Sequence, residues 1–124
     1  MRQEDLVGAW RLKEFRFYNA DGHVSHPWEA SSRGLLCYTH NGFMSASILY
    51  IAKQRTAQFL SYCGPFEVQD DCVIHHIEMS SNDRLMGTDQ VRRLSFDGET
   101  LTLSASPSLY GGEGTSADLL WQRA

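Results

Sequence analysis

The residue best suited to chemistry is Arg92, two positions after Gln90. A hairpin expected at Asp97-Gly98 has a parity that places both side chains on the inward face. An inward arginine needs a partner or a wet cavity. It could hold a carboxylate, an enolate or a polarised carbonyl in a site where water is scarce. The alternative is an internal ion pair with Glu14 or Glu78.

His75 and His76 are adjacent on a predicted strand. Neighbouring strand residues point to opposite faces, so the two imidazoles cannot bind the same metal ion. The residue count from the preceding turn puts His75 inward, and a β-bulge would put His76 there instead. Either histidine is a candidate for proton transfer near neutral pH. The alternative is a core or rim histidine with a hydrogen-bond partner.

Asn41-Gly42 favours a type I′ hairpin turn, which would pair Tyr38 with Ser45. Tyr38 then offers a phenolic donor, unless it is a buried tyrosine whose hydroxyl already has a partner. The predicted catalytic residues are His75, His76 and Arg92, and the predicted ligand-binding residues are Tyr38, Met44, Ser45, Glu78 and Gln90.

Other reaction classes lack their motifs. His23 and His26 have no third histidine, cysteine or carboxylate at ligand spacing, so we expect no metal site. The chain also has no Gly-x-Ser-x-Gly elbow, phosphate-binding loop or paired-cysteine site. These absences argue against esterase, nucleotide-binding and zinc-ribbon functions. We expect no cofactor.

Short strands must position these side chains. Turn signals recur at short intervals, and the runs between them are rich in aromatic and β-branched residues, which is typical of an all-β sandwich or barrel. One short helix is predicted over Lys53 to Ser61. The eight predicted strands lie near 8–18, 33–40, 43–51, 62–69, 72–80, 88–96, 100–106 and 115–123.

The expected hairpin after residue 96 defines one interior face. It would set Leu94 opposite Leu101 and Arg92 opposite Leu103, with either a two-residue or a four-residue loop keeping the same parity. The resulting apolar face consists of Leu94, Phe96, Leu101 and Leu103.

The composition of the chain limits the number of domains and the kinds of partner. The 124 residues are 42% hydrophobic and 21% charged, which fits one domain over 1–124. A net charge of −4 without a basic stripe argues against a nucleic-acid partner. No run approaches the roughly 18 apolar residues of a membrane span, and no signal-peptide pattern opens the chain. We interpret Cys37, Cys63 and Cys72 as reduced core residues and expect a cytoplasmic protein.

Several motifs in order resemble a known family. They are Gly8-Ala-Trp10-Arg-Leu12, Gly34-Leu-Leu-Cys-Tyr38, Asn41-Gly-Phe-Met-Ser-Ala46, Cys63-Gly64-Pro-Phe-Glu-Val68, His75-His76-Ile-Glu78, Gly87-Thr-Asp-Gln-Val-Arg92 and Leu120-Trp121-Gln-Arg123. Over nearly the whole chain they resemble the small stand-alone lipocalin-like domain family, relatives of the calycin β-barrels. The resemblance implies an all-β fold, an eight-stranded antiparallel up-and-down barrel around one small, mostly apolar molecule. It also implies that Arg123 covers Trp10 and closes one barrel end.

Barrels of this kind include carriers, haem pockets, and cyclases or isomerases of secondary metabolism, so the fold does not choose among them. The leading hypothesis is a barrel that encloses a small hydrophobic or aromatic metabolite and isomerises or cyclises it. The wall would fold the substrate, Arg92 and Tyr38 would polarise a carbonyl, and His75 or His76 would move a proton. The alternatives are a non-catalytic carrier and haem binding through an inward histidine. We expect a small-molecule partner, no nucleic acid, no membrane, and a monomer or homodimer.

Overall fold

The computed structural model describes residues 1–52, 56–105 and 116–124. Within these ranges the chain forms ten β-strands and two short 3₁₀ turns. The strands are β1 (Gly8–Tyr18), β2 (Val24–Ser25), β3 (Arg33–Tyr38), β4 (Phe43–Tyr50), β5 (Gln58–Gln69), β6 (Cys72–His76), β7 (Met79–Ser80), β8 (Asp89–Phe96), β9 (Thr100–Ala105) and β10 (Ser116–Arg123). The 3₁₀ turns are η1 (Gln3–Asp5) and η2 (Asp83–Leu85).

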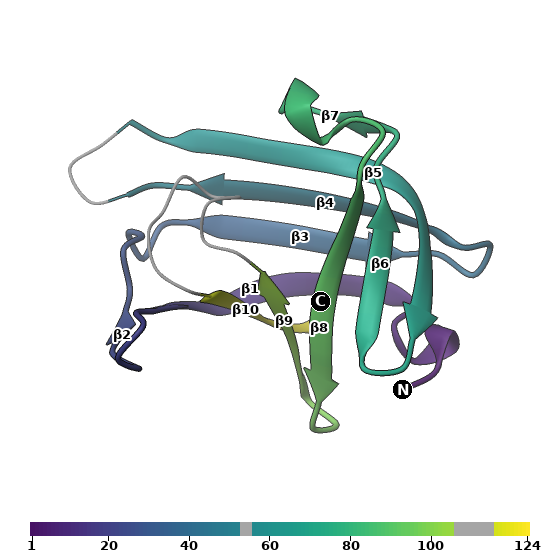
Figure 1. Ribbon diagram of the computed structural model, residues 1–124, viewed down its shortest axis with the longest axis horizontal. Helices are drawn as coiled ribbons and strands as arrows, with labels where there is room; N and C mark the ends of the chain where they lie inside the picture. The colour runs from purple at the N-terminus through teal and green to yellow at the C-terminus, as the bar shows by residue number, and fades with distance from the viewer. Residues whose placement is uncertain (53–55, 106–115) are drawn as a thin grey trace.

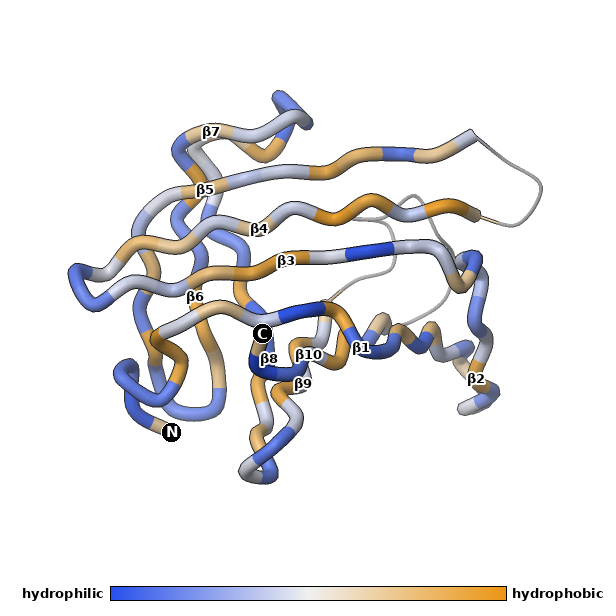
Figure 2. Tube along the Cα trace, turned by 180° about the vertical axis from the view of Figure 1, so that it is seen from behind, coloured by the Kyte–Doolittle hydropathy of each residue, from blue (hydrophilic) through white to orange (hydrophobic). Residues whose placement is uncertain are grey.

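Eight strands form a closed antiparallel barrel (Figure 1). Their order is β10-β9-β8-β6-β5-β4-β3-β1, and β1 pairs with β10 to close the ring. The short strand β2 pairs with β1, and β7 pairs with β5. Figure 2 shows β1, β3, β4 and β5 side by side on one wall, with β6, β8 and β9 crossing behind them. The predicted eight-stranded up-and-down barrel is confirmed.

The predicted helix over Lys53 to Ser61 is wrong. Residues 53–55 lie outside the described residues, Thr56 and Ala57 are in a loop, and β5 begins at Gln58. Residues 58–61 pair with β4 over its last four positions. The helical spacing is only about two turns long, and pairing with a neighbouring strand overrides so weak a local preference. The described residues contain no α-helix.

The hairpin between β3 and β4 differs in register from the predicted one. Tyr38 pairs with Met44 and not with Ser45. A type I′ turn needs positive φ at both central residues, but only Gly42 has it, at 87°, and Asn41 does not. The loop is longer by one residue as a result. This single shift turns Met44 inward and Ser45 outward.

The β8–β9 hairpin keeps the predicted parity with a register shifted by two residues. Leu94 pairs with Leu103, and Phe96 pairs with Leu101, so the predicted pairings of Leu94 with Leu101 and of Arg92 with Leu103 are wrong. An even shift leaves every side chain on its expected face. Arg92 and the three leucines are accordingly buried, while Phe96 is 36% exposed near the barrel end.

The barrel end beside the N-terminus is closed. The indole Nε1 of buried Trp10 donates to the carbonyl oxygen of Leu6 at 2.9 Å. The guanidinium carbon of Arg123 lies 4.1 Å from the centroid of the Trp10 ring. The same guanidinium donates to the carbonyl oxygens of Val7 and Asp5, each at 2.8 Å. The predicted structural contact between Trp10 and Arg123 is confirmed.

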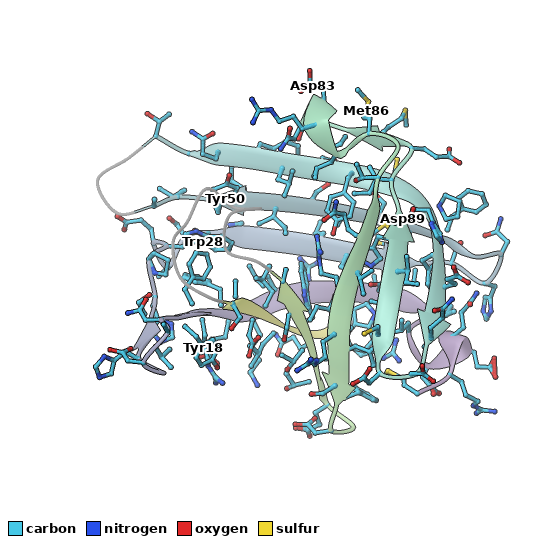
Figure 3. All side chains as sticks on the ribbon, in the orientation of Figure 1. Tyr18, Trp28, Tyr50, Asp83, Met86 and Asp89 are labelled. Carbon is cyan, nitrogen blue, oxygen red and sulfur yellow. The ribbon has the colours of Figure 1, made fainter. Side chains whose placement is uncertain are left out.

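Aromatic rings gather at the other end of the barrel. Trp28 and Tyr50 stack with ring centroids 4.9 Å apart, and Figure 3 shows both at the end away from the N-terminus. Phe15 lies 4.6 Å from Trp28, and Phe17 meets the same indole edge-on at 5.6 Å. Aromatic side chains therefore line the barrel interior towards this end.

The three cysteines do not lie in the core. Cys37 is exposed, and Cys63 and Cys72 are partly exposed. Each precedes or follows an inward residue on its strand, so its own side chain points outward. The interpretation of these residues as core positions is wrong, because their apolar neighbours in the sequence belong to the opposite face. All three thiols are free.

Gly64 allows β5 to pass unusually close to the chain that follows β6. A Cβ built at Gly64 would overlap the carbonyl oxygen of His76, so no other residue fits there. The amide of Glu78 donates to the carbonyl oxygen of Cys63 at 2.9 Å. This close approach holds β6, which carries His75, against β5.

Candidate functional site

A small cavity lies inside the barrel. Its volume is about 10 Å³, roughly the space of one water molecule. Five aliphatic residues form its apolar wall. The other four lining residues carry polar groups and are Tyr62, His75, Arg92 and Trp121. An apolar wall with a few convergent polar groups is the composition typical of a small-molecule site.

Arg92 enters the interior from β8 and is only 5% exposed. Its guanidinium donates to the carbonyl oxygen of Val91 at 3.2 Å and to Oε1 of Gln90 at 3.3 Å. Gln90 donates in turn to the hydroxyl of Thr88 at 2.9 Å, which fixes the orientation of its amide. Both bonds from Arg92 are long for an N–H donor. Since a guanidinium has five N–H groups, it retains donors for a further acceptor.

The alternative ion pair of Arg92 with Glu14 or Glu78 is not formed. Glu14 accepts two hydrogen bonds from Arg16, at 3.0 and 2.9 Å. Glu78 is exposed and lies on the outer face. Across residues 1–52, 56–105 and 116–124, no carboxylate forms an ion pair with Arg92. Within that part of the chain the cation is buried without a counter-ion.

His75 is 1% exposed, which confirms its predicted inward placement. It lies between two tyrosines: the Tyr38 hydroxyl is 2.7 Å from Nε2, and the Tyr62 hydroxyl is 3.1 Å from Nδ1. Burial, followed by the positive charge of Arg92, lowers the pKa of His75 to about 3. The imidazole is therefore neutral near pH 7. Burial raises the pKa of both tyrosines, so they remain protonated.

His76 points outward, and its ring contacts two carboxylates. Its Nδ1 lies 2.7 Å from Oδ1 of Asp89, and its Nε2 lies 3.0 Å from Oε1 of Glu67. Asp89 first, and then Glu67, raise the pKa of His76 by hydrogen bonding to the charged ring. The predicted site residue His76 is thus on the other side of the barrel wall from His75.

The remaining predicted ligand-binding residues divide between the two faces. Tyr38 and Met44 are buried in the interior, and Gln90 holds Arg92 from the same strand. Ser45 and Glu78 are exposed, so the structure does not bring them to the cavity. The one-residue register shift of the β3–β4 hairpin accounts for the placement of Ser45.

Two cavity residues were missed by reasoning from the sequence. Tyr62 follows the alternation of buried residues along β5, which would have identified it as inward. Trp121 is 2% exposed, and its Nε1 has no hydrogen-bond partner among the described residues. Alternation along β10 could have indicated its burial, but no sequence signal indicates an unpaired indole N–H.

The described residues contain no group of three or more histidine, cysteine, aspartate or glutamate side chains arranged to hold a metal ion. They also contain no helix long and apolar enough to span a membrane. Haem ligation by His75 would have to break a hydrogen bond to Tyr38 or Tyr62, because both ring nitrogens are already engaged.

A closed antiparallel up-and-down barrel, with a tryptophan–arginine contact at one end and polar groups in an apolar interior, has the architecture of the lipocalin-type barrels. Comparison with family models agrees. The lipocalin-like domain model matches residues 7–57 and 50–124, and the chain belongs to this family.

The fold also resembles solved structures. One is a redesigned beta barrel with a TM-score of 0.52 and 14% sequence identity, the match covering 98% of this chain and 94% of the other. At that identity the likeness concerns the fold alone. Comparison with curated proteins gives no match.

Proposed function

We propose that the protein binds a small, mostly apolar or aromatic molecule inside the barrel and anchors one of its oxygen atoms on Arg92. The observation that carries this proposal is the buried guanidinium at the cavity, which has no carboxylate partner in the described residues. An uncompensated buried cation costs several kcal/mol of stability. A ligand oxygen placed against it would offset part of that cost.

The size of the cavity limits how the ligand lies. A space of about 10 Å³ holds about one water molecule, so even a head group enters only when lining side chains move apart. Ligand pockets usually measure roughly 300 Å³ or more. The ligand body must therefore lie further along the interior, where Ile48 is followed by Tyr50 on β4 and Trp28 stacks on that ring. Binding then requires side chains to move apart, and this lowers the apparent affinity by the fraction of open protein.

Isomerisation or cyclisation of the bound molecule is the second candidate function. It is favoured by the chain of hydrogen bonds from Tyr62 through His75 to Tyr38, because Tyr62 and His75 line the cavity. A neutral imidazole between two phenols can pass a proton without becoming a strong base. Arg92 would stabilise the oxygen on which charge develops. Exchange of solvent deuterium into a bound ketone, lost in His75→Gln while binding persists, would support this candidate over simple binding.

Binding is tested with toluene, benzyl alcohol, benzoate and decanoate, each added to the purified protein while the melting temperature is recorded. At a concentration of a hundred times Kd, a ligand stabilises by about 2.7 kcal/mol, which raises Tm by roughly 8–12 °C for a chain of this size. The matched variants are Arg92→Met in the interior and Arg93→Met on the exposed face. A saturable rise in Tm that is smaller in Arg92→Met but unchanged in Arg93→Met supports the proposal. If none of the probes raises Tm, the proposal is contradicted.

A further inference from the structure

We propose, on the basis of the proposed function, that the cavity binds the carboxylate of its ligand and that Trp121 donates one of the hydrogen bonds. The cavity is lined by Arg92 from β8, Tyr62 from β5 and Trp121 from β10. The indole N–H of Trp121 has no acceptor among the described residues, and Arg92 and Tyr62 add further donor groups at the same cavity.

The indole N–H of Trp121 is the clearest case. The side chain is 2% exposed, and its Nε1 has no acceptor within the described ranges. Trp10 is buried equally well in the same barrel, but its Nε1 donates to the carbonyl oxygen of Leu6 at 2.9 Å. Leaving a buried donor unpaired costs about 1–3 kcal/mol. A buried indole therefore normally finds a partner, and Trp121 lines the cavity, where a bound molecule would supply one.

The Trp121 ring cannot easily turn to another partner. A Cβ built at Gly34 would lie 3.0 Å from Cη2 of Trp121 and 3.0 Å from Cβ of Leu12, so the ring already fills the space that this glycine leaves. The backbone of Trp121 is paired on both sides, with Leu12 and with Leu101. The orientation of the indole is thus fixed by packing, which is what a pre-organised donor requires.

The hydroxyl of Tyr62 supplies the second polar group at the cavity. Its oxygen lies 3.1 Å from Nδ1 of His75, and it also interacts with Arg92 by a side-chain hydrogen bond. Nε2 of the same imidazole lies 2.7 Å from the hydroxyl of Tyr38, which does not line the cavity. The proposal places the proton of neutral His75 on Nδ1, which leaves the O–H of Tyr62 free to donate into the cavity.

The third donor is the guanidinium of Arg92, which has N–H groups beyond those bound by Val91 and Gln90. Among the described residues its side-chain partners are Oε1 of Gln90, at 3.3 Å, and the hydroxyl of Tyr62. Apart from Tyr62, His75, Arg92 and Trp121, the lining residues are aliphatic. A site with three donors and one positive charge selects an acceptor that is negatively charged, and a carboxylate can accept at two oxygens from such a set.

The test uses sodium formate, because it is small enough to reach the donors without the ligand body. The indole N–H signals of the three tryptophans are followed in proton–nitrogen correlation spectra, and Trp121→Phe assigns the one that disappears. Formate should shift the Trp121 signal downfield in a saturable manner and leave the Trp10 signal unchanged. Formamide, which has the same size without the charge, should bind at least roughly tenfold more weakly.

Variants assign the effect to the cavity. Arg92→Met should weaken formate binding by roughly 10- to 100-fold, since hydrogen bonds to charged groups contribute about 1.5–3 kcal/mol. Arg93→Met, one residue away on the exposed face, should bind formate like the parent. If Arg92→Met does not fold, Trp121→Phe is titrated with formate by calorimetry and should bind it roughly tenfold more weakly.

The outcomes separate this site from the proposed function. An indole signal that formate does not move, or that formamide moves equally, overturns the carboxylate site. If benzyl alcohol raises Tm in the parent and less in Arg92→Met, while formate has no effect on Trp121, the proposed function stands and the carboxylate site is overturned. If formate binds but toluene, benzyl alcohol, benzoate and decanoate do not, the carboxylate site stands and the proposed function is overturned.

Discussion

Replacing Arg92 by Met should stabilise the protein without ligand by about 1 kcal/mol. Removing a buried charge recovers a desolvation cost of several kcal/mol, here taken as about 4. Against this stand two long hydrogen bonds, at 3.2 and 3.3 Å, which contribute about 1 kcal/mol each. The Oε1 of Gln90 loses its donor, which costs about 1 kcal/mol more. Met keeps the length of the side chain, so the aliphatic wall stays filled.

Urea unfolding of the parent and of Arg92→Met measures the difference, and a gain of 1 kcal/mol corresponds to a rise in Tm of about 3–5 °C. Arg93→Met is the matched control, because exposed substitutions usually change stability by less than about 0.5 kcal/mol. If Arg92→Met is folded but less stable than the parent by about 2 kcal/mol or more, then Arg92 has a structural counter-ion. The reasoning behind both proposals would then be refuted.

Three further predictions concern the groups around the cavity and its outer wall. The pKa of His75 is lowered from an unfolded value of about 6.5 to about 3, so its contribution to stability is fully present above pH 6.5. The free energy of unfolding should fall by on the order of 4 kcal/mol as the pH decreases toward 3. In urea unfolding, the stability of His75→Gln should depend less on pH than that of the parent. The pKa of His76 is raised, so its contribution to stability is present below pH 6.5 and is lost as the pH rises through the folded pKa. At pH 6 the free energies of unfolding of His76→Gln and the parent should differ by at most about 1 kcal/mol, since exposed ion pairs are screened by solvent. This difference should disappear at pH 9 or in high salt. Gly34→Ala should destabilise by about 1–3 kcal/mol in thermal unfolding and move the Trp121 indole signal, because the added methyl group presses on that ring.

The barrel and its inward residues were predictable because they depend on parity. Strands alternate faces every residue, so an error of two residues at the β8–β9 hairpin left Arg92 and Leu94 on the correct side. The turn before β6 was placed correctly: Val68 pairs with Val73 in the structure, and the inward prediction for His75 is therefore correct.

The predictions from the sequence were wrong where a single residue or a long-range contact determines the local structure. A single extra residue in the β3–β4 loop exchanged the faces of Ser45 and Met44. The difference between a type I′ turn and a longer loop lies in the φ angle of Asn41, which the Asn-Gly pair does not determine. Residues Gln58 to Ser61 became strand because β4 offers them partners, and no local pattern reveals that.

The polar groups of the candidate site come from five strands: Tyr38 from β3, Tyr62 from β5, His75 from β6, Arg92 from β8 and Trp121 from β10. β10 reaches the others only through its pairing with β9 and with β1, the contact that closes the barrel. The indole of Trp121 therefore joins the other donors only in the closed barrel. Any ligand that uses all three donors binds the closed state alone, and by linkage it stabilises the entire barrel rather than one hairpin.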